Sequence, residues 1–281
     1  MRYVAVIWLP LLLFAGCQRS TQYCEDDSHC PSGWLCGPGD LCVEAPVVDL
    51  GSGDSSAGDL AGPKPVYCRD IRAANRLATD GNYTLYVNGD GSKPWTAFCF
   101  DMSNATGQGG PLEYLTLPNG DGNFSQFTVG FQNKGSNVRT NYWRLRVEPK
   151  GLAVNPNDQT YATSTGTLTG NSPPSYQVTS MPYGVAMDCL GPGSMSGVAR
   201  LDLGGTPFTF ISDRFATGGS APGGTATYST DRKVVSIRGG GGMNKLDVYD
   251  CGWMAAIGGN GRPINLMPPN ALGPTILLEY P

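Results

Sequence analysis

The sequence predicts a mainly β protein, an irregular β-sandwich or barrel stabilised by disulfides and preceded by a small disulfide-rich module. Its composition is the first observation, because 40 glycines and 22 prolines with only 15% charged residues are typical of short strands joined by turns. Its nine cysteines are the second. Short segments of alternating apolar and polar residues, which recur from Tyr67 onward, are the third.

Residues 1–16 have the features of a lipoprotein signal peptide. Arg2 precedes an apolar run from Val4 to Phe14, which is shorter than the roughly 20 residues of a transmembrane helix. The ending Ala-Gly-Cys resembles a bacterial lipobox, so we expect Cys17 to carry a diacylglycerol group and become the mature N-terminus. Ordinary signal-peptidase cleavage is the alternative, although the large Phe14 fits its small site poorly. The sequence therefore predicts an exported lipoprotein, anchored at the outer membrane or cell surface through Cys17.

Residues 17–44 are expected to form a small cysteine-rich disulfide module. Four of its cysteines are spaced six residues apart, with turn-forming prolines and glycines between them: Cys24, Cys30, Cys36 and Cys42. So short a segment cannot bury a core, and an oxidising compartment favours disulfides over zinc. We expect the pairs Cys24–Cys36 and Cys30–Cys42, although three connectivities are open, and a metal site that includes His29 is the alternative.

Residues 45–66 have the composition of a flexible linker, and residues 67–281 form the expected β-domain. The linker mixes Ala, Gly, Ser, Asp and Pro without periodicity. With Cys17 lipidated, four cysteines remain on each side of it, so each folded part can pair its cysteines internally.

The β-domain opens with one predicted helix over 68–78 and a hairpin. Tyr83, Leu85 and Val87 alternate before a turn at 88–91, and the chain returns through a second strand that ends at Cys99. Residues 113–127, "EYLTLPNGDGNFSQF", predict a strand, a polar turn and a strand, hence a second hairpin. Later alternations bring the expected total to roughly eight to twelve strands.

The sequence excludes the common catalytic sets from the β-domain. Its one histidine, His29, lies in the cysteine-rich module, so no Ser-His or Cys-His pair can form, and no H-E-x-x-H zinc motif occurs. We therefore predict no catalytic residue, no metal site and no cofactor. A net charge of −4 without a basic block also argues against nucleic acid as a partner. Paired carboxylates suffice for glycoside hydrolysis, so a polysaccharide hydrolase remains an alternative, with five candidates: Asp101, Glu113, Asp188, Asp202 and Asp247.

Two kinds of loop motif could hold ions but have simpler interpretations. The "NGDG" runs at 88–91 and 119–122 could ligate calcium, yet Asn-Gly and Asp-Gly are favoured turn residues. The run 238–245, "RGGGGMNK", lacks the Gly-Lys-Ser/Thr ending of a phosphate loop, so a flexible loop is expected.

Aromatic residues are the remaining candidates for recognition. Most are expected in the core, including Tyr114, Phe124 and Phe127 of the second hairpin, and a minority on a binding surface. The candidates are Trp95, Tyr114, Phe124, Phe127, Tyr142, Trp143, Tyr183 and Trp253.

Four sequence blocks resemble the GON domain, the C-terminal module of certain ADAMTS metalloproteases. They are "CRDIRAANRLATDGNYTLYVNGDGSKPWTAFCFDM", "PLEYLTLPNGDGNFSQF", "MPYGVAMDC" and "RLDLGGTPF", which stand in the family's order and span most of 67–281. The stretch "YDCGWMAAIGG" departs from the family, because it supplies only Cys251 where the family is richer in cysteine.

The resemblance implies a non-catalytic module, associated with extracellular matrix enzymes and secretory transport. The family's zinc site lies in a separate catalytic domain, which this chain lacks. Within the β-domain we expect the disulfides Cys68–Cys99 and Cys189–Cys251. The sequence as a whole predicts a surface-anchored binding or adhesion module for an extracellular polysaccharide or protein, with a structural envelope protein that has no ligand as a further alternative.

Overall fold

A computed structural model of the chain describes residues 34–37, 41–44, 63–104, 110–130, 134–170, 176–211, 214–219, 221–242, 251–256 and 276–281. The chain divides into two compact units, Met1–Gly58 and Asp59–Pro281. Cys17, Cys24, His29, Cys30 and Asp247, with the expectations that concern them, lie outside the described residues. Among the described residues, no helix is both long enough and apolar enough to cross a membrane.

In the first unit the structure describes one antiparallel hairpin. Strands β1 (Trp34–Gly37) and β2 (Leu41–Glu44) pair so that the backbones of Cys36 and Cys42 lie opposite each other. The disulfide pairs expected in this module stay predictions, since two of the four cysteines are not described.

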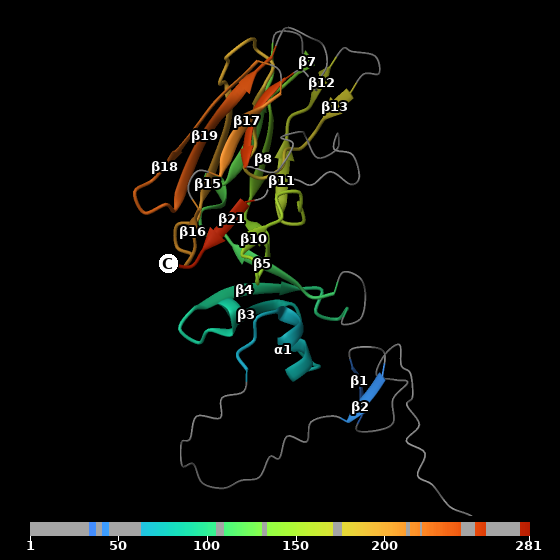
Figure 1. Cartoon of the computed structure of the whole chain (residues 1–281). Coiled ribbons are helices and arrows are strands. Elements are labelled where there is room, and N and C mark those ends of the chain that lie inside the picture. The colour runs from blue at the N-terminus through green and yellow to red at the C-terminus, as the bar shows by residue number, and fades with distance from the viewer. Residues whose placement is uncertain are drawn as a thin grey trace, which may run out of the picture. The chain divides into compact units, whose positions relative to one another are not determined.

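The described residues of the second unit form one short helix and a series of short strands (Figure 1). The helix is α1 (Cys68–Ala74), and single 3₁₀ turns are η2 (Val87–Gly89) and η3 (Gly120–Gly122). The strands are β3 (Gly81–Tyr86), β4 (Pro94–Phe100), β5 (Leu112–Thr116), β6 (Phe124–Thr128), β7 (Lys134–Gly135), β8 (Val138–Tyr142), β9 (Arg144–Glu148), β10 (Ala153–Val154), β11 (Ala162–Thr165), β12 (Leu168–Gly170), β13 (Tyr176–Val178), β14 (Ala186–Asp188), β15 (Gly197–Asp202), β16 (Thr209–Phe210), β17 (Phe215–Gly218), β18 (Pro222–Tyr228), β19 (Val234–Gly241), β20 (Gly252–Ala256) and β21 (Ile276–Glu279).

The described strands of this unit form three sheets. The seven-stranded sheet has the order β16-β21-β10-β9-β5-β4-β3, and a small sheet has the order β13-β12-β7. The nine-stranded sheet follows β17-β20-β14-β6-β15-β19-β18, and β8 and β11 extend it from β6. The mainly β fold that the sequence predicted is confirmed, and the sheets form a nearly closed, barrel-like structure. The strands outnumber the prediction because several have only two or three residues, too few to show an alternation.

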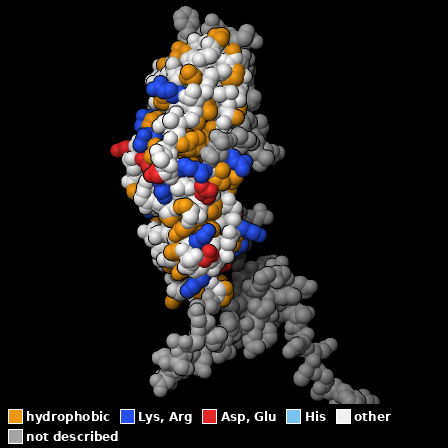
Figure 2. All heavy atoms as spheres, turned by 60° about the vertical axis from the view of Figure 1, so that its left-hand side comes forward, with side chains coloured by type: hydrophobic (Ala, Val, Ile, Leu, Met, Phe, Trp, Pro, Cys, Tyr) orange, Lys and Arg blue, Asp and Glu red, His pale blue; other side chains and the backbone are white. Residues whose placement is uncertain are grey.

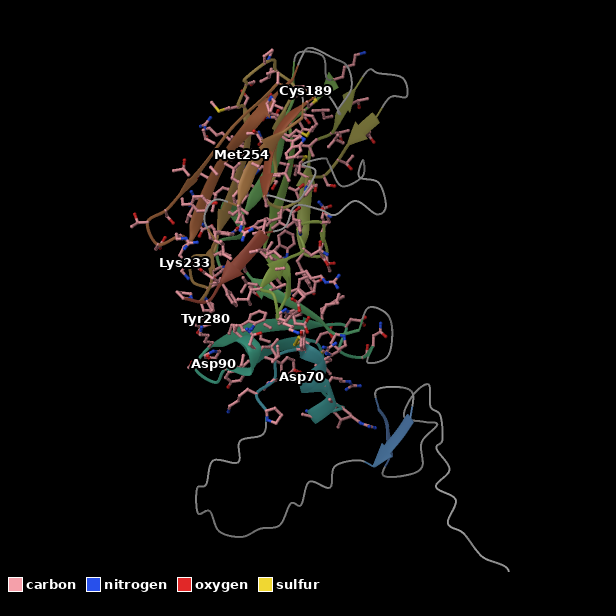
Figure 3. All side chains as sticks on the ribbon, viewed as in Figure 1. Asp70, Asp90, Cys189, Lys233, Met254 and Tyr280 are labelled. Atoms are coloured by element: carbon pink, nitrogen blue, oxygen red, sulfur yellow. A yellow bond between two sulfur atoms is a disulfide. The ribbon has the colours of Figure 1, made fainter. Side chains whose placement is uncertain are left out.

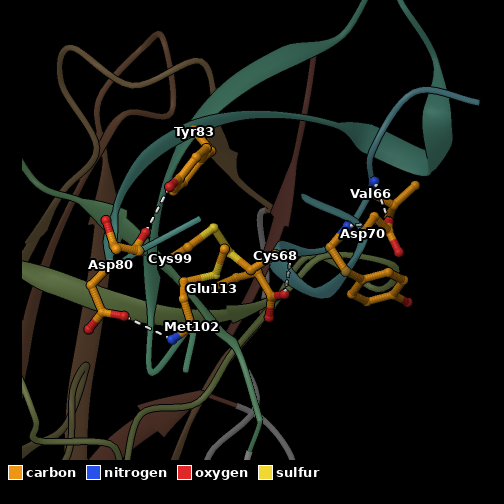
Figure 4. The surroundings of a disulfide bond; sticks show 10 residues. Val66, Cys68, Asp70, Asp80, Tyr83, Cys99, Met102 and Glu113 are labelled. Carbon is orange, nitrogen blue, oxygen red and sulfur yellow. Dashed lines mark hydrogen bonds between the residues drawn. A yellow bond between two sulfur atoms is a disulfide. The ribbon is translucent and has the colours of Figure 1, made fainter. Parts of the chain in front are cut away.

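The helix α1 is the predicted one, although it ends at Ala74 rather than near residue 78. The side chain of Asp70 fixes its start, because its Oδ2 accepts hydrogen bonds from the backbone N–H groups of Val66 and Tyr67, both at 2.8 Å (Figure 4). A carboxylate in the first turn satisfies backbone donors that have no partner within the helix.

The first predicted hairpin is confirmed as β3 and β4. Their register places Gly81 opposite Cys99 and Leu85 opposite Trp95, and the side chains of Leu85, Trp95 and Cys99 are buried. Asn88 has a φ of 52° in the connecting turn, a conformation that asparagine tolerates better than most residues.

The second predicted hairpin, residues 113–127, is wrong. β5 pairs with β4 and β9 in the seven-stranded sheet, whereas β6 pairs with β8, β14 and β15 in the nine-stranded sheet. The turn η3 therefore carries the chain from one sheet to the other. Asn119 shapes it, since its Oδ1 accepts from the Gly122 N–H at 3.1 Å and its Nδ2 donates to Asp202 at 2.9 Å.

Asn123 holds this crossing in place. Its side chain is fully buried, and its Nδ2 donates to the carbonyl oxygens of Asn119 at 2.8 Å and Asp202 at 2.9 Å. Its Oδ1 accepts from the Asp202 N–H at 2.7 Å and from the Tyr183 hydroxyl at 2.8 Å. One amide thus joins η3, β15 and the segment before β14.

Part of the glycine run 238–245 is a strand rather than the flexible loop that the sequence predicted. Residues up to Gly241 belong to β19, which runs directly over β14 and β20. A Cβ on Gly239 would lie 2.7 Å from the backbone nitrogen of Met254, and one on Gly197 would lie 2.3 Å from that of Met187. The glycines are required because the backbones of the two layers approach without side chains between them.

The structure joins the cysteines of this unit in the two pairs that the sequence analysis named. Cys68 and Cys99 have a Cα–Cα distance of 5.5 Å, and Cys189 and Cys251 one of 4.6 Å. The first bond fastens α1 to β4, and Cys189 lies at the end of the unit remote from α1 (Figure 3).

Replacing Asn123 by alanine should lower the free energy of unfolding by about 2–3 kcal/mol, because two buried acceptors and two buried donors lose their partner. Asn82→Ala on exposed β3 is the matched control, with a change within about 0.5 kcal/mol. Urea denaturation of both variants measures the difference, and equal midpoints would contradict the role given to Asn123.

Removing the Cys68–Cys99 disulfide in the double variant Cys68→Ser, Cys99→Ser should cost about 3–4 kcal/mol, because the bond closes a loop with a sequence separation of 31. Thermal and urea unfolding measure this loss. Peptide mapping without reductant tests the pairing itself, and a peptide that links Cys99 to Cys189 would refute it.

Candidate functional site

The carboxylates proposed for a hydrolase have separate structural partners. Asp188 is fully buried and accepts five hydrogen bonds. Its Oδ1 accepts from the N–H groups of Leu190 and Gly241, and its Oδ2 accepts from the Ser194 hydroxyl and from the N–H groups of Ser196 and Gly197, at 2.6–3.1 Å. Asp188 therefore organises the loop between β14 and β15, and both of its oxygens are engaged by backbone and hydroxyl donors of the fold.

The other described candidates do not join it. Asp202 accepts from Asn119 and from the Gly204 N–H, whereas Asp101 accepts from the Asn104 side chain at 3.0 Å. Glu113 accepts from the Cys68 N–H on another part of the seven-stranded sheet. No two of these carboxylates share a hydrogen-bond partner, so the structure does not assemble them into a pair.

No metal site is apparent in the described part of the chain, where no three His, Cys, Asp or Glu residues lie close enough together. In each "NGDG" run one side-chain oxygen accepts a hydrogen bond within the turn. Asn119 accepts from Gly122, and Asp90 accepts from the Ser92 N–H at 2.9 Å. The runs are therefore built as turns.

Most of the predicted aromatic candidates are in the core. Fully or nearly fully buried are Trp95, Tyr114, Phe127, Tyr142 and Tyr183. Trp253 and Phe124 are half-buried, and Phe124, which was expected inside, lies under the guanidinium of Arg139 at 3.4 Å from the ring centre. Trp143 is 41% exposed at the corner between β8 and β9.

A different group of aromatic and arginine side chains forms the candidate site. We call it the aromatic surface, and its members are Phe98, Phe100, Tyr114, Arg144, Arg146 and Tyr161. β4 places Trp95, Ala97 and Cys99 in the core, so alternation turns Phe98 and Phe100 to the opposite face of the seven-stranded sheet. Tyr114 lies opposite Phe98 on β5, and Arg146 lies opposite Tyr114 on β9.

The rings of this surface meet edge to face. Tyr161, from the loop before β11, lies 4.9 Å from Tyr114, 5.7 Å from Phe98 and 6.0 Å from Phe100 between ring centroids. This arrangement is favourable for aromatic quadrupoles and holds the half-buried rings of Phe98, Phe100 and Tyr161 rigidly against buried Tyr114.

Arginines complete the surface. The Arg144 guanidinium lies 3.7 Å from the Phe98 ring centre and 4.6 Å from that of Tyr161, which presents charged donors above an apolar base. Tyr114 donates its hydroxyl to Asp158 at 3.0 Å, and burial raises the pKa of Tyr114 to about 12. Arg146 lies 3.8 Å from the same Asp158 carboxylate.

A cleft of about 490 Å³ adjoins the aromatic surface at Arg146. Its polar lining residues are Tyr67, Arg69, Glu113, Arg146, Glu148 and Asn155. Glu113 is 8% exposed, and its Oε1 accepts from the Cys68 N–H at 2.8 Å (Figure 4). Burial raises the pKa of Glu113, against the lowering effect of that hydrogen bond and of Arg69 and Arg146. The cleft thus offers a carboxyl group between guanidinium groups, a set suited to hydrogen-bonding a polar ligand.

The stability of the protein should depend on pH through Glu113. Because its folded pKa is raised, its contribution is present below its ordinary pKa of 4.5 and is lost as the pH rises through the folded pKa. Glu113→Gln keeps an acceptor for Cys68 and removes this dependence, so the variant should gain stability relative to the original protein over that rise. Urea denaturation across a pH series measures the difference. A constant difference between the two proteins would contradict a raised pKa.

Sequence reasoning missed Phe98, Phe100, Arg144 and Tyr161 as members of a site. For the two phenylalanines a signal existed, because assigning Trp95, Ala97 and Cys99 to the core already placed them on the other face of β4. No local pattern marks Tyr161, which reaches the sheet from a loop.

The comparisons with known proteins give one match. The family model of the GON domain matches residues 65–137, the segment that contains α1, β3, β4, β5 and β6. No curated protein and no solved structure matches the chain. The blocks at 181–189 and 200–208, which also resemble the family, lie beyond the matched segment. GON domains are non-catalytic extracellular modules, and the match supports this general class of function for the matched segment. The GON domain that the sequence motifs predicted is therefore confirmed for residues 65–137 of this chain.

Proposed function

We propose that this protein is a surface-anchored, non-catalytic binding module that holds an extracellular polysaccharide on its aromatic surface. The observation that carries the proposal is the rigid cluster of the half-buried rings of Phe98, Phe100 and Tyr161, which pack against buried Tyr114 and of which two lie under Arg144. Phe100 is half-buried and lies under no guanidinium of a described residue, so it can contact the apolar face of a sugar, while the Arg144 guanidinium donates hydrogen bonds to hydroxyl or carboxylate oxygens.

The neighbouring cleft supports the same function. It continues the surface at Arg146 and adds Glu113, Glu148 and Asn155 as further hydrogen-bonding groups. A few convergent polar groups beside an apolar base are typical of ligand sites in general. A polysaccharide hydrolase is less well supported, because Asp188 and Asp202 are engaged in maintaining the fold.

The anchored location is also part of the proposal. The lipobox-like Ala-Gly-Cys predicts a lipid on Cys17, and the linker over 45–66 would separate the anchor from the binding unit. The disulfides agree with an oxidising extracellular environment. Mass spectrometry of the membrane fraction tests the lipid directly, and an N-terminal peptide with an unmodified Cys17 would contradict it.

Binding to an array of extracellular polysaccharides and glycoproteins tests the proposed function. We expect saturable binding to at least one neutral polysaccharide, and Arg144→Ala should weaken it about tenfold, the loss typical of one recognition residue. Arg238→Ala, an exposed arginine on β19, is the matched control and should leave this binding unchanged.

Equal losses in the two variants, or binding to glycoproteins whose sugar chains have been removed, would contradict a polysaccharide site on the aromatic surface. Adding a chelator tests the calcium alternative at the same time, since loss of binding would show that the turns at 88–91 or 119–122 hold an ion.

A further inference from the structure

The outer face of the nine-stranded sheet is a second polar surface, which the proposed function does not use. Strand alternation defines it. On β15, Ala199 and Leu201 are buried while Val198 and Arg200 face outward, and on β19 Val235 and Ile237 are buried while Ser236 and Arg238 face outward. β6 and β8 alternate in the same way.

The strand register arranges the outward residues in two neighbouring rows, which we call the arginine face. One row crosses five strands through Arg139, Gln126, Val198, Arg238 and Thr225. The next row runs parallel to it through Asn141, Phe124, Arg200, Ser236 and Thr227. β11 lengthens both rows with exposed Thr165 and Thr163.

The two rows contain three arginines and no acidic residue. Figure 2, which brings the side of β18 and β19 forward, shows blue Lys and Arg side chains among white and orange atoms on this side of the protein, with red Asp and Glu side chains beside some of them. Asp202 pairs with Arg200 and Asp121 attracts Arg139, so Arg238 is the arginine of the rows that has no acidic partner among the described residues.

The three arginines differ in the contacts that their guanidinium groups make. Arg139 lies flat on Phe124, and its Nε donates to Asn141 at 3.0 Å. Arg200 lies 3.4 Å from Asp202 at the edge of the rows, and Arg238 is exposed without an ion pair or hydrogen bond to any described residue. Arg139 and Arg238 stand three strands apart, about 14 Å at the usual strand spacing, with Arg200 between them. The face therefore offers spaced cationic groups rather than one pocket.

The chemistry of the face selects the kind of partner. Protein interfaces need a buried apolar centre, but the exposed large hydrophobic residues among those described, Leu77, Trp143, Leu190 and Met195, lie outside these strands. Single-stranded nucleic acid needs open aromatic rings for stacking, whereas Phe124, the aromatic residue of the rows, is covered by Arg139. The threonine, serine, glutamine and asparagine side chains between the arginines match an anionic chain rich in hydroxyl groups.

We propose that the arginine face binds an anionic polysaccharide laid across strands β8, β6, β15 and β19, with its sulfate or carboxylate groups on Arg139, Arg200 and Arg238. This proposal goes beyond the aromatic surface, which is formed by the other sheet. The affinity for such a polysaccharide should fall as the salt concentration rises, because the contacts are exposed charge pairs that salt screens.

Titration of the full chain with dextran sulfate, polygalacturonate and neutral dextran tests the proposal. We expect one or both anionic polymers to bind and neutral dextran not to bind, and the pattern distinguishes sulfate from carboxylate recognition. Arg238→Gln should weaken binding about threefold to tenfold and Arg238→Glu more strongly, with less salt dependence in both, because Arg238 supports no other described residue. Arg238→Lys should retain most of the affinity.

Lys150→Gln, which removes an exposed charge between β9 and β10 of the other sheet, serves as the control and should leave dextran sulfate and polygalacturonate binding unchanged. If Arg144→Ala removes binding and Arg238→Glu does not, the arginine face is refuted while the aromatic surface stands. Equal binding of neutral dextran, or tighter binding of single-stranded DNA that is equally sensitive to Arg238→Glu, would also overturn the assignment to an anionic polysaccharide.

Discussion

The side chain of Asn123 is the connection on which the two large sheets depend. Both its donor and its acceptor atoms are buried and bonded, so it fixes where the chain leaves β5, passes η3 and enters β6. That crossing sets the register of β6 against β8 and β15. Both candidate surfaces follow from it, since β5 contributes to the aromatic surface and β6 to the arginine face.

A second constraint is the close contact of backbones at the far end of the same unit. Gly197 and Gly239 allow β15 and β19 to lie on β14 and β20, and buried Asp188 ties the adjoining loop to the N–H of Gly241. No side chain fits at these two glycine positions, and the hydrogen bonds of Asp188 and the Cys189–Cys251 bond add to the packing of the neighbouring buried side chains. The high glycine content of the chain therefore reflects packing as well as turns.

Much of the fold could be predicted from the sequence, because alternation and turn residues act locally. The mainly β class, α1 and the β3–β4 hairpin follow from such signals. The path of residues 113–127 could not, since Asn119-Gly120 has the same local chemistry in a hairpin and in a crossing, and the choice is made by the distant Asp202. The sequence also did not reveal that residues up to Gly241 of the glycine run form a strand. The need for glycine there comes from the nearby backbones of β14 and β20, not from the local sequence. Of the candidate site, Phe98 and Phe100 were within reach of alternation, whereas Tyr161 is brought in by a loop.

The burial of Asn123 has a consequence for how the protein is produced. Asn123-Phe-Ser is an acceptor sequence for N-linked glycans, and so is Asn82-Tyr-Thr on the exposed face of β3. In a eukaryotic secretory host, a sugar attached to Asn123 before folding would occupy the amide that must enter the interior, whereas one on Asn82 would remain in solvent. Expression in such a host would therefore divide the material into a folded population without a glycan at Asn123 and a modified population unable to close the connection between its sheets.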